Sequence, residues 1–467
     1  MIISTIAVVP AKAQVPGRYS LQQCVDIALK NNINVRQREL NLNSAEADRF
    51  QSRMAILPSL NGQVTHNYNT GFAINPITNA TQRDVTFRSN NFGLNAQMNL
   101  FNGFQNTNNI RLQQANTKAV EMDVVAAKNN LALNVANAYM QVLLNTEIVQ
   151  ARGEQANATK QQVLRQEKLY EYGSVNRVKY LQVKAQYANE ESQRVLSQTQ
   201  LDQSYLTLWQ LMNMVPDTNN KIMRPDSNLL VVENVAQSAD EIYQEFVGKS
   251  PEVMAAKRRS EAARMNYNMA LGARSPKLTL NAGLNSFYTT QSQRGLGAAS
   301  VTPQQIGIDS TGIPVYTLFT SYRNMETVPF GDQFDRNLGR FVGFTLSVPI
   351  FNNWQANTNV QKQRINQTSS DLNQKQAELD LYKNINQAYL DFKSTRKRYD
   401  ASNDNYEANK EALALAESQF NLGALNAADL IVSKNLFLQA ETTMLQAKYE
   451  LLFRRKVIDF YLGKPLY

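Results

Sequence analysis

Few side chains in this sequence could carry out catalysis. The 467 residues include one histidine, His66, and one cysteine, Cys24. His66 falls in an alternating polar and apolar stretch and Cys24 in a helical one, and neither belongs to a known catalytic or metal-binding motif. Acidic neighbours such as Glu190 and Glu191 are typical of a helix surface. The sequence therefore predicts no enzyme, no metal site and no cofactor, and it gives His66 a structural or lumen-facing role.

Basic residues outnumber acidic ones, but they do not form a nucleic-acid surface. The net charge is +9, with lysine and arginine spread along the whole chain. Three basic clusters fall inside predicted helices, and no aromatic residues alternate with them as a base-stacking platform would require. We interpret these clusters as solvated helix faces; they are Lys257–Arg259, Arg396–Arg398 and Arg454–Lys456.

The chain contains the same pattern twice. From about Phe92 to Asn213, each feature returns 250 positions later without a gap. Further upstream the offset is 218, so one connection between Ser286 and Arg340 is 32 residues longer in the second half. A repeat of this length predicts two structurally similar halves packed together. Equivalent pairs include Leu131 and Leu381, Val135 and Ile385, Gly173 and Gly423, and Asn176 and Asn426.

Each half ends in a predicted helical hairpin. The stretch from Trp354 to Leu422 contains no glycine or proline, so it can form one helix of roughly 100 Å. Its apolar residues step by four and three, as in a coiled-coil seam: Leu381, Ile385, Ala388 and Phe392, with Tyr399 one heptad later. Gly423 is expected to end this helix at a tip spanning Gly423–Asn426. The returning helix is predicted to pack through Ile431, Asn435, Leu438, Thr442, Leu445, Tyr449 and Leu452.

Shorter helices and strands precede each hairpin. Ser20–Asn32 predicts an amphipathic helix with Ser20 as its N-cap, and residues 34–56 and 251–273 predict two further helices. After each of these two helices, the spacing of apolar residues changes to every second position. Strands of about ten residues are then predicted, each with one apolar and one polar face. Their apolar residues are Leu60, Val64 and Tyr68; Phe92, Leu94, Ala96 and Met98; Leu278, Leu280, Ala282 and Leu284; and Val342, Phe344, Leu346 and Val348.

Such strands suit either a soluble half-buried sheet or a membrane-spanning barrel. Two features favour the membrane. The connections at one end, Thr70–Asp84 and Thr289–Asn337, are polar and predicted to be loops, whereas the other end connects to the long helices. Four strands cannot close a barrel, and an open edge is not tolerated in lipid. Several chains must therefore share one barrel: two would give eight strands and three would give twelve, enough for a pore.

These patterns divide the chain into five segments. Residues 1–13 are expected to be the end of a secretory signal, because Ile2–Val9 is apolar and the Ala11-Lys12-Ala13 pattern would leave Gln14 first. Residues 14–213 form the first repeat, with strands at about 58–102. Residues 214–250 form an irregular segment between the repeats. Residues 251–463 form the second repeat, with strands at about 276–352, and residues 464–467 are a tail.

The combination resembles the TolC family of outer-membrane efflux channels. The resemblance covers nearly the whole chain after residue 13, and its motifs follow the same order in both repeats. They are Leu57-Pro58-Ser59-Leu60 before the first strand, Val348-Pro349-Ile350-Phe351-Asn352 before the long helix, and Tyr170-x-x-Gly173 and Phe420-x-x-Gly423 at the tips. The resemblance implies an α+β membrane protein: a homotrimeric twelve-stranded β-barrel, four strands per chain, in outer-membrane lipid. A long α-helical coiled-coil barrel would continue it into the periplasm.

The same resemblance implies a periplasmic gate. Family members commonly carry an aspartate six residues after the tip glycine, which corresponds to Asp429, whereas the first repeat has Lys179 there. We expect Asp429 and Lys179 to approach each other in the closed state. The family's other gate partners, a tyrosine and an arginine, are replaced here by Phe420 and Leu425. An ordinary solvated helix charge is the alternative for Asp429.

The tips are further implied to contact a periplasmic adaptor protein, which links the channel to an inner-membrane pump. The residues concerned are Gly173, Ser174, Val175, Gly423, Ala424 and Leu425. The expected function is passive efflux or secretion across the outer membrane. The alternatives are a trimeric coiled-coil envelope or surface protein without a pore and, more weakly, a soluble helical adaptor. The sequence leaves the cargo open among drugs, metal ions and secreted protein.

Overall fold

The computed structural model describes residues 18–74, 81–216, 221–224 and 235–464. The expected signal segment, residues 1–13, and the tip of the first strand connection lie outside these residues, as do parts of the segment between the repeats. The chain forms two compact units. One comprises residues up to 46, 115–261 and 368 onward; the other comprises residues 47–114 and 262–367. The limits of the units fall within long helices.

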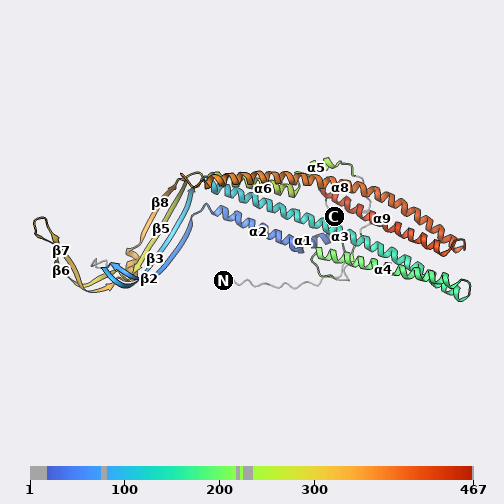
Figure 1. The fold of residues 1–467 in the computed structure, drawn as a ribbon, viewed down its shortest axis with the longest axis horizontal. Helices are drawn as coiled ribbons and strands as arrows, with labels where there is room; N and C mark the ends of the chain where they lie inside the picture. Colours follow the sequence, from blue (N-terminus) through green and yellow to red (C-terminus); the bar gives the residue numbers. More distant parts are fainter. Residues whose placement is uncertain (1–17, 75–80, 217–220, 225–234, 465–467) are drawn as a thin grey trace. The chain divides into compact units, whose positions relative to one another are not determined.

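The second unit contains a four-stranded antiparallel sheet. Its order is β2 (Ser59–Ile74), β3 (Thr81–Phe101), β5 (Lys277–Thr289) and β8 (Gly339–Ser347), as Figure 1 shows. The register places residues of one kind opposite each other: Val64 faces Phe92, and Leu280 faces both Met98 and Phe344. The predicted strands are confirmed, although their lengths range from 9 to 21 residues instead of about ten.

The two faces of this sheet differ as the alternation predicts. Large apolar side chains stand exposed on one face, including Leu60, Val64, Val342, Phe344 and Leu346. The opposite face carries a cross-strand ladder of polar side chains. Thr279 donates to Asn99 Oδ1 at 3.2 Å, and Asn281 donates to Thr345 Oγ1 at 3.1 Å. One face is therefore suited to lipid and the other to water.

The connection from residue 289 to 337 is not a loop, and this part of the sequence interpretation was wrong. It contains an antiparallel pair of strands, β6 (Gln293–Ile308) and β7 (Pro314–Thr327), and a short helix, α7 (Phe330–Arg336). The pairing satisfies the backbone groups on the facing edges of the two strands, which a loop of 49 residues (289 to 337 inclusive) would leave without partners in the chain. Its turn is held by Asp309, which accepts from the N–H of Thr311 at 2.9 Å and of Ile313 at 2.8 Å.

Helix α7 fixes the base of this strand pair. Gln333, only 2% exposed, donates to the carbonyl oxygens of Thr289 and Val328 and accepts from the Thr289 N–H, all within 3.0 Å. Phe330 and Phe334 both pack edge-on against Phe92 of β3. The extra length of the second repeat thus forms an ordered attachment on the apolar face of the sheet.

The first unit contains the remaining helices. They are α1 (Leu21–Asn31), α5 (Ala239–Phe246), α4 (Arg177–Leu211) and α9 (Ala427–Tyr461), with most of α2 (Ile33–Met54), α3 (Gln105–Glu171) and α8 (Gln355–Asn421) and the start of α6 (Pro251–Gly272). Ser20 caps α1 through a full capping box, as predicted. Two-residue strands, β1 (Arg18–Tyr19) and β4 (Lys221–Ile222), pair in parallel.

Two apolar cores hold these helices together, and they follow the repeat. Leu131, Val135 and Ala138 lie in one core, and their equivalents 250 positions later, Leu381, Ile385 and Ala388, lie in the other. Val35 and Val253, related by the offset of 218, divide between the cores in the same way. The predicted seam of α8 is confirmed, because its residues from Leu381 to Phe392 that step by four and three are less than a tenth exposed.

The seam predicted for α9 is wrong at its tip end. Ile431 is only half-buried and Asn435 is exposed, whereas Leu430 and Lys434 are both 2% exposed. The predicted pattern keeps steps of four and three through Ile431 and Asn435 and so passes over Lys434, although the long aliphatic stem of lysine can line a helix contact. From Leu438 onward the predicted seam residues Leu445, Tyr449 and Leu452 are buried.

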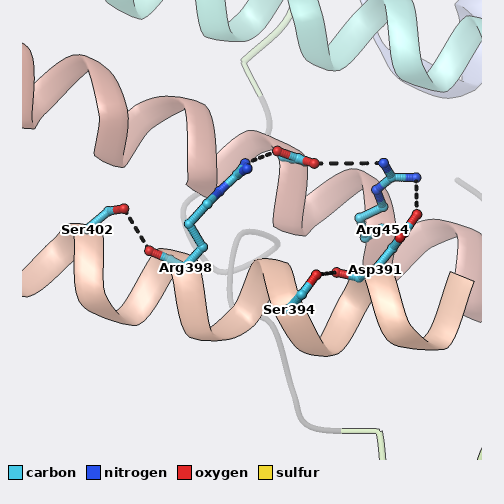
Figure 2. A network of polar contacts seen from close by, with 6 residues as sticks. Asp391, Ser394, Arg398, Ser402 and Arg454 are labelled. Atoms are coloured by element: carbon cyan, nitrogen blue, oxygen red, sulfur yellow. Dashed lines mark hydrogen bonds and ion pairs between the residues drawn. The ribbon is translucent and has the colours of Figure 1, made fainter. Parts of the chain in front are cut away.

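The basic clusters of α8 and α9 form ion pairs with acidic side chains of the same chain, which is typical of a helix surface. Arg398 pairs with Glu450, and Arg454 bridges Glu450 at 3.8 Å and Asp391 at 3.0 Å. Figure 2 shows this network, in which Ser394 and Ser402 bind backbone carbonyls of the same helix. The charges therefore brace the helix pair.

Candidate gate and tip residues

The two helical hairpins turn at glycines in the left-handed region of backbone conformation. Gly173 has φ +70° and Gly423 has φ +82°. In each turn the N–H after the glycine donates to a carbonyl five residues earlier: Ser174 to Leu169 at 2.8 Å and Ala424 to Gln419 at 2.9 Å. This is the Schellman arrangement that closes helix C-termini. The predicted tips are confirmed in both repeats.

The returning helices begin at equivalent asparagines. Asn176 accepts from the N–H of Lys179 at 2.8 Å, and Asn426 accepts from the N–H of Asp429 at 2.9 Å. Asn426 also donates to the Asp429 carboxylate at 2.6 Å. Both candidate gate residues thus occupy the third position of a capped helix, where the cap fixes their backbone and leaves their side chains at the tip.

The two positions differ electrostatically. A carboxylate such as Asp429 is favoured in the first helical turn, whereas an ammonium such as Lys179 is disfavoured there by about 0.3–1 kcal/mol. The Lys179 ammonium lies 5.4 Å from the ring centroid of Phe420, a distance at which a cation is attracted to an aromatic face. This contact joins α4 of the first hairpin to α8 of the second and offsets the unfavourable position of the charge.

The structure therefore brings together two of the three predicted gate residues within one chain, Lys179 and Phe420. Among the ion pairs formed by the described side chains, none joins Lys179 to Asp429. The Asp429 side chain is exposed. The approach of Lys179 to Asp429 stays a prediction for the assembled, closed state.

The predicted adaptor-contacting residues are accessible. Gly173, Ser174, Gly423 and Ala424 are exposed, and Val175 and Leu425 are half-buried. Two large apolar side chains beside them are also highly exposed: Tyr172 at 83% and Leu422 at 81%. The sequence interpretation missed both, although their place next to the tip glycine in each repeat was a visible signal. Single exposed apolar side chains are common, so it is the position of these two beside the tip glycines that makes them candidates for contact with an adaptor.

Cys24 lies in helix α1 and His66 in strand β2, and both have structural surroundings. Cys24 is completely buried in α1, and burial raises the pKa of its thiol to about 12, so it is a weak nucleophile at neutral pH. His66 lies on β2, with its Nδ1 against the side chain of Asn90 on β3 and its ring edge-on to Tyr68. In the described part of the chain, no helix is long and apolar enough to span a membrane.

Comparisons with known proteins agree with this architecture. A curated relative, the outer membrane protein TolC of Vibrio cholerae, is 24% identical over 276 residues, an alignment that spans 57% of this chain and 58% of the relative. The crystal structure of CusC superposes with a TM-score of 0.75 at 19% identity, covering 95% of this chain and 92% of that one. The Campylobacter jejuni CmeC outer membrane channel superposes with a TM-score of 0.73 at 18% identity, covering 94% and 84%.

A family model extends the likeness over both repeats. The model described as outer membrane efflux protein matches residues 24–214 and 242–464, which include both helical hairpins and all four strands of the main sheet. The chain therefore belongs to the outer membrane efflux protein family.

Proposed function

We propose that this outer-membrane protein is the exit channel of a tripartite efflux or secretion system. Three copies would share one barrel and pass cargo without catalysis from a periplasmic adaptor and an inner-membrane pump to the exterior. The observation that carries the proposal is the four-stranded sheet. Its edge strands β2 and β8 each have one partner in the sheet, and its apolar face is exposed. Both features require neighbouring copies and lipid.

The polar face of the sheet supports conduction over the pore-free alternative. A coiled-coil fibre without a pore would not require strands whose apolar face contacts lipid. Nor would it require a ladder of asparagine and threonine side chains on the opposite face of those strands. Such a ladder suits the wall of a water-filled lumen, and twelve strands leave room for one. Cargo would enter between the hairpin tips, which the adaptor would contact through Gly173–Val175, Gly423–Leu425 and the adjoining Tyr172 and Leu422.

The gate would consist of Lys179, Phe420 and Asp429, repeated by threefold symmetry. The contact of Lys179 with Phe420 holds the two tips of one chain together, and Asp429 narrows the entrance. A half-buried contact of this kind is worth about 1 kcal/mol, so three copies supply roughly 3 kcal/mol. That difference changes the ratio of open to closed channels on the order of a hundredfold.

Conductance of single channels in a planar bilayer tests this gate. The double variant Lys179→Ala/Asp429→Ala is expected to raise the closed-state conductance, and Phe420→Ala to raise it by a similar factor. Lys179→Arg keeps both the charge and the attraction to the ring, so it should conduct like the parent protein. An unchanged conductance in the double variant would remove the gate from the proposal.

A further inference from the structure

A lysine is buried between the two hairpins, beyond the tip residues. Lys434 of α9 is 2% exposed, and its Nζ lies 3.9 Å from Oε1 of Glu417 on α8, too far for a hydrogen bond. Among the described residues this Nζ has no hydrogen-bond partner. Burial lowers the pKa of Lys434, and the nearby carboxylates of Glu417 and Glu190 oppose that effect. A cation buried in this way needs the negative charge around it.

The second carboxylate comes from the other hairpin. Glu190 of α4 is 6% exposed, and its Oε1 accepts hydrogen bonds from Gln155 at 3.3 Å and Gln186 at 2.8 Å. Its Oε2 has no hydrogen-bond partner within the described part of the chain. Gln186 also donates to Asn435, the neighbour of Lys434, at 3.4 Å. A positive and a negative side chain from different hairpins are thus buried at the same level along the hairpins. Each has a charged atom without a hydrogen-bond partner among the described residues, Nζ of Lys434 and Oε2 of Glu190.

The internal repeat shows that hairpin folding alone does not require this burial. The residues 250 positions earlier are Lys184 and Glu167, so the first hairpin carries the same two charges. There Lys184 is exposed and donates to the hydroxyl of Tyr180 at 3.4 Å, which in turn donates to Glu167 at 3.0 Å. In the second hairpin Leu430 replaces that tyrosine. Contact with the first hairpin, and with α4 in particular, accounts for the burial of Lys434.

The energetics of such a pair are asymmetric. Charges that stay together in a protein interior roughly offset their lost hydration, but removing one leaves the other buried and uncompensated, which is strongly unfavourable. Separation of the hairpins would return both groups to water. We propose that Lys434 and Glu190, supported by Glu417, form an ionic latch that holds the second hairpin against the first. The role of this latch in restraining the tips rests on the proposed function as a gated channel.

A double-mutant cycle on the full-length protein in detergent tests the latch. Lys434→Met and Glu190→Gln are each expected to raise amide hydrogen exchange at least tenfold in residues 184–193 of α4 and 430–441 of α9. The double variant Lys434→Met/Glu190→Gln should return to within about threefold of the parent, because no uncompensated charge is left. Lys184→Met removes the exposed equivalent and should leave exchange unchanged. Helical circular dichroism on heating confirms that each variant is folded.

Additive effects in the cycle, or single variants that exchange like Lys184→Met, would overturn the latch. If Glu190→Gln does not fold, Glu417→Gln replaces it in the cycle, since the Glu417 side chain is half exposed and its loss is milder. Hydrogen exchange needs no pore, so it separates this inference from the proposed function. A non-additive cycle in a protein that never conducts would support the latch and refute the channel. If the effects on hydrogen exchange are additive and the gate variants conduct, only the latch is refuted.

Discussion

Replacing Phe344 by arginine is expected to prevent the protein from inserting into the outer membrane. Phe344 stands 68% exposed on β8 among Val342 and Leu346, on the apolar face of the sheet. An arginine facing lipid near the bilayer midplane costs about 2–4 kcal/mol in a membrane barrel. Three copies multiply that cost to roughly 6–12 kcal/mol, which is comparable to the whole stability of a typical domain. Outer-membrane fractionation measures the result.

The matched control is the next residue of the same strand. Thr345 points to the opposite, polar face, where its hydroxyl accepts from Asn281 at 3.1 Å. Arginine at this position is expected to reach the membrane in near-normal amount, since it extends into water and loses only one exposed hydrogen bond. Equal loss of both variants would contradict the assignment of the two faces, because it would mean that an arginine is no more costly on the apolar face than on the polar one.

Replacing Ile385 by alanine is expected to cause a large loss of stability in the helical unit. Ile385 is completely buried in the core that α8 forms with α5, α6 and α9. Truncating a buried isoleucine to alanine costs about 2–5 kcal/mol, because the surrounding side chains only partly fill the cavity. The midpoint of thermal unfolding, followed by helical circular dichroism in detergent, should fall by several degrees.

The repeat provides a second comparison for this prediction. Val135, the equivalent residue in the first core, is also completely buried, and Val135→Ala removes one methylene fewer, worth about 0.8 kcal/mol. Its midpoint should fall less than that of Ile385→Ala. Lys383→Ala, on an exposed part of the same helix α8, should change the midpoint by no more than about a degree. Comparable losses in all three variants would show that the two cores do not carry the stability of the unit.

Local chemistry explains which parts of the fold can be predicted from the sequence. The tips follow from glycine and asparagine at fixed spacing, because a left-handed residue and a side-chain cap specify a helix end regardless of distant contacts. The seam of α8 follows from apolar residues at steps of four and three. The four strands follow from their alternation, and the boundaries of β2 with α2 and of β8 with α8 follow from Pro58 and Pro349. These features repeat, so each is supported twice.

The errors concern features that depend on tertiary contacts. Strand β6, which pairs with β7, is interrupted by Gly297, Pro303 and Gly307, so its period of two is hard to distinguish from a loop. Their pairing becomes evident only where α7 fixes the base through Gln333. Lys434 was passed over because the predicted seam of α9 runs through Ile431 and Asn435, and a charged residue is seldom buried. Its burial arises from α4 of the other hairpin, and no local pattern contains that contact.

Only part of the candidate gate was predictable from the sequence, because some of its features are local and others depend on tertiary contacts. The repeat placed Lys179 and Asp429 at equivalent positions, and the caps that hold them are local. The contact between Lys179 and Phe420 joins residues 241 positions apart and depends on how the hairpins pack (420 less 179). The exposed Tyr172 and Leu422 were overlooked because apolar residues are first assigned to a core.

The molecular mass and the conductance of the detergent-purified protein in a planar bilayer test the central claim most directly. We expect a trimer that conducts weakly, and whose conductance rises when Asp429 or Lys179 is replaced. The trimer follows from an apolar sheet face with unpaired edge strands, and the low conductance follows from a closed periplasmic tip. A monomer would contradict the shared barrel. A trimer that does not conduct even after those replacements would contradict the channel and favour a structural envelope protein.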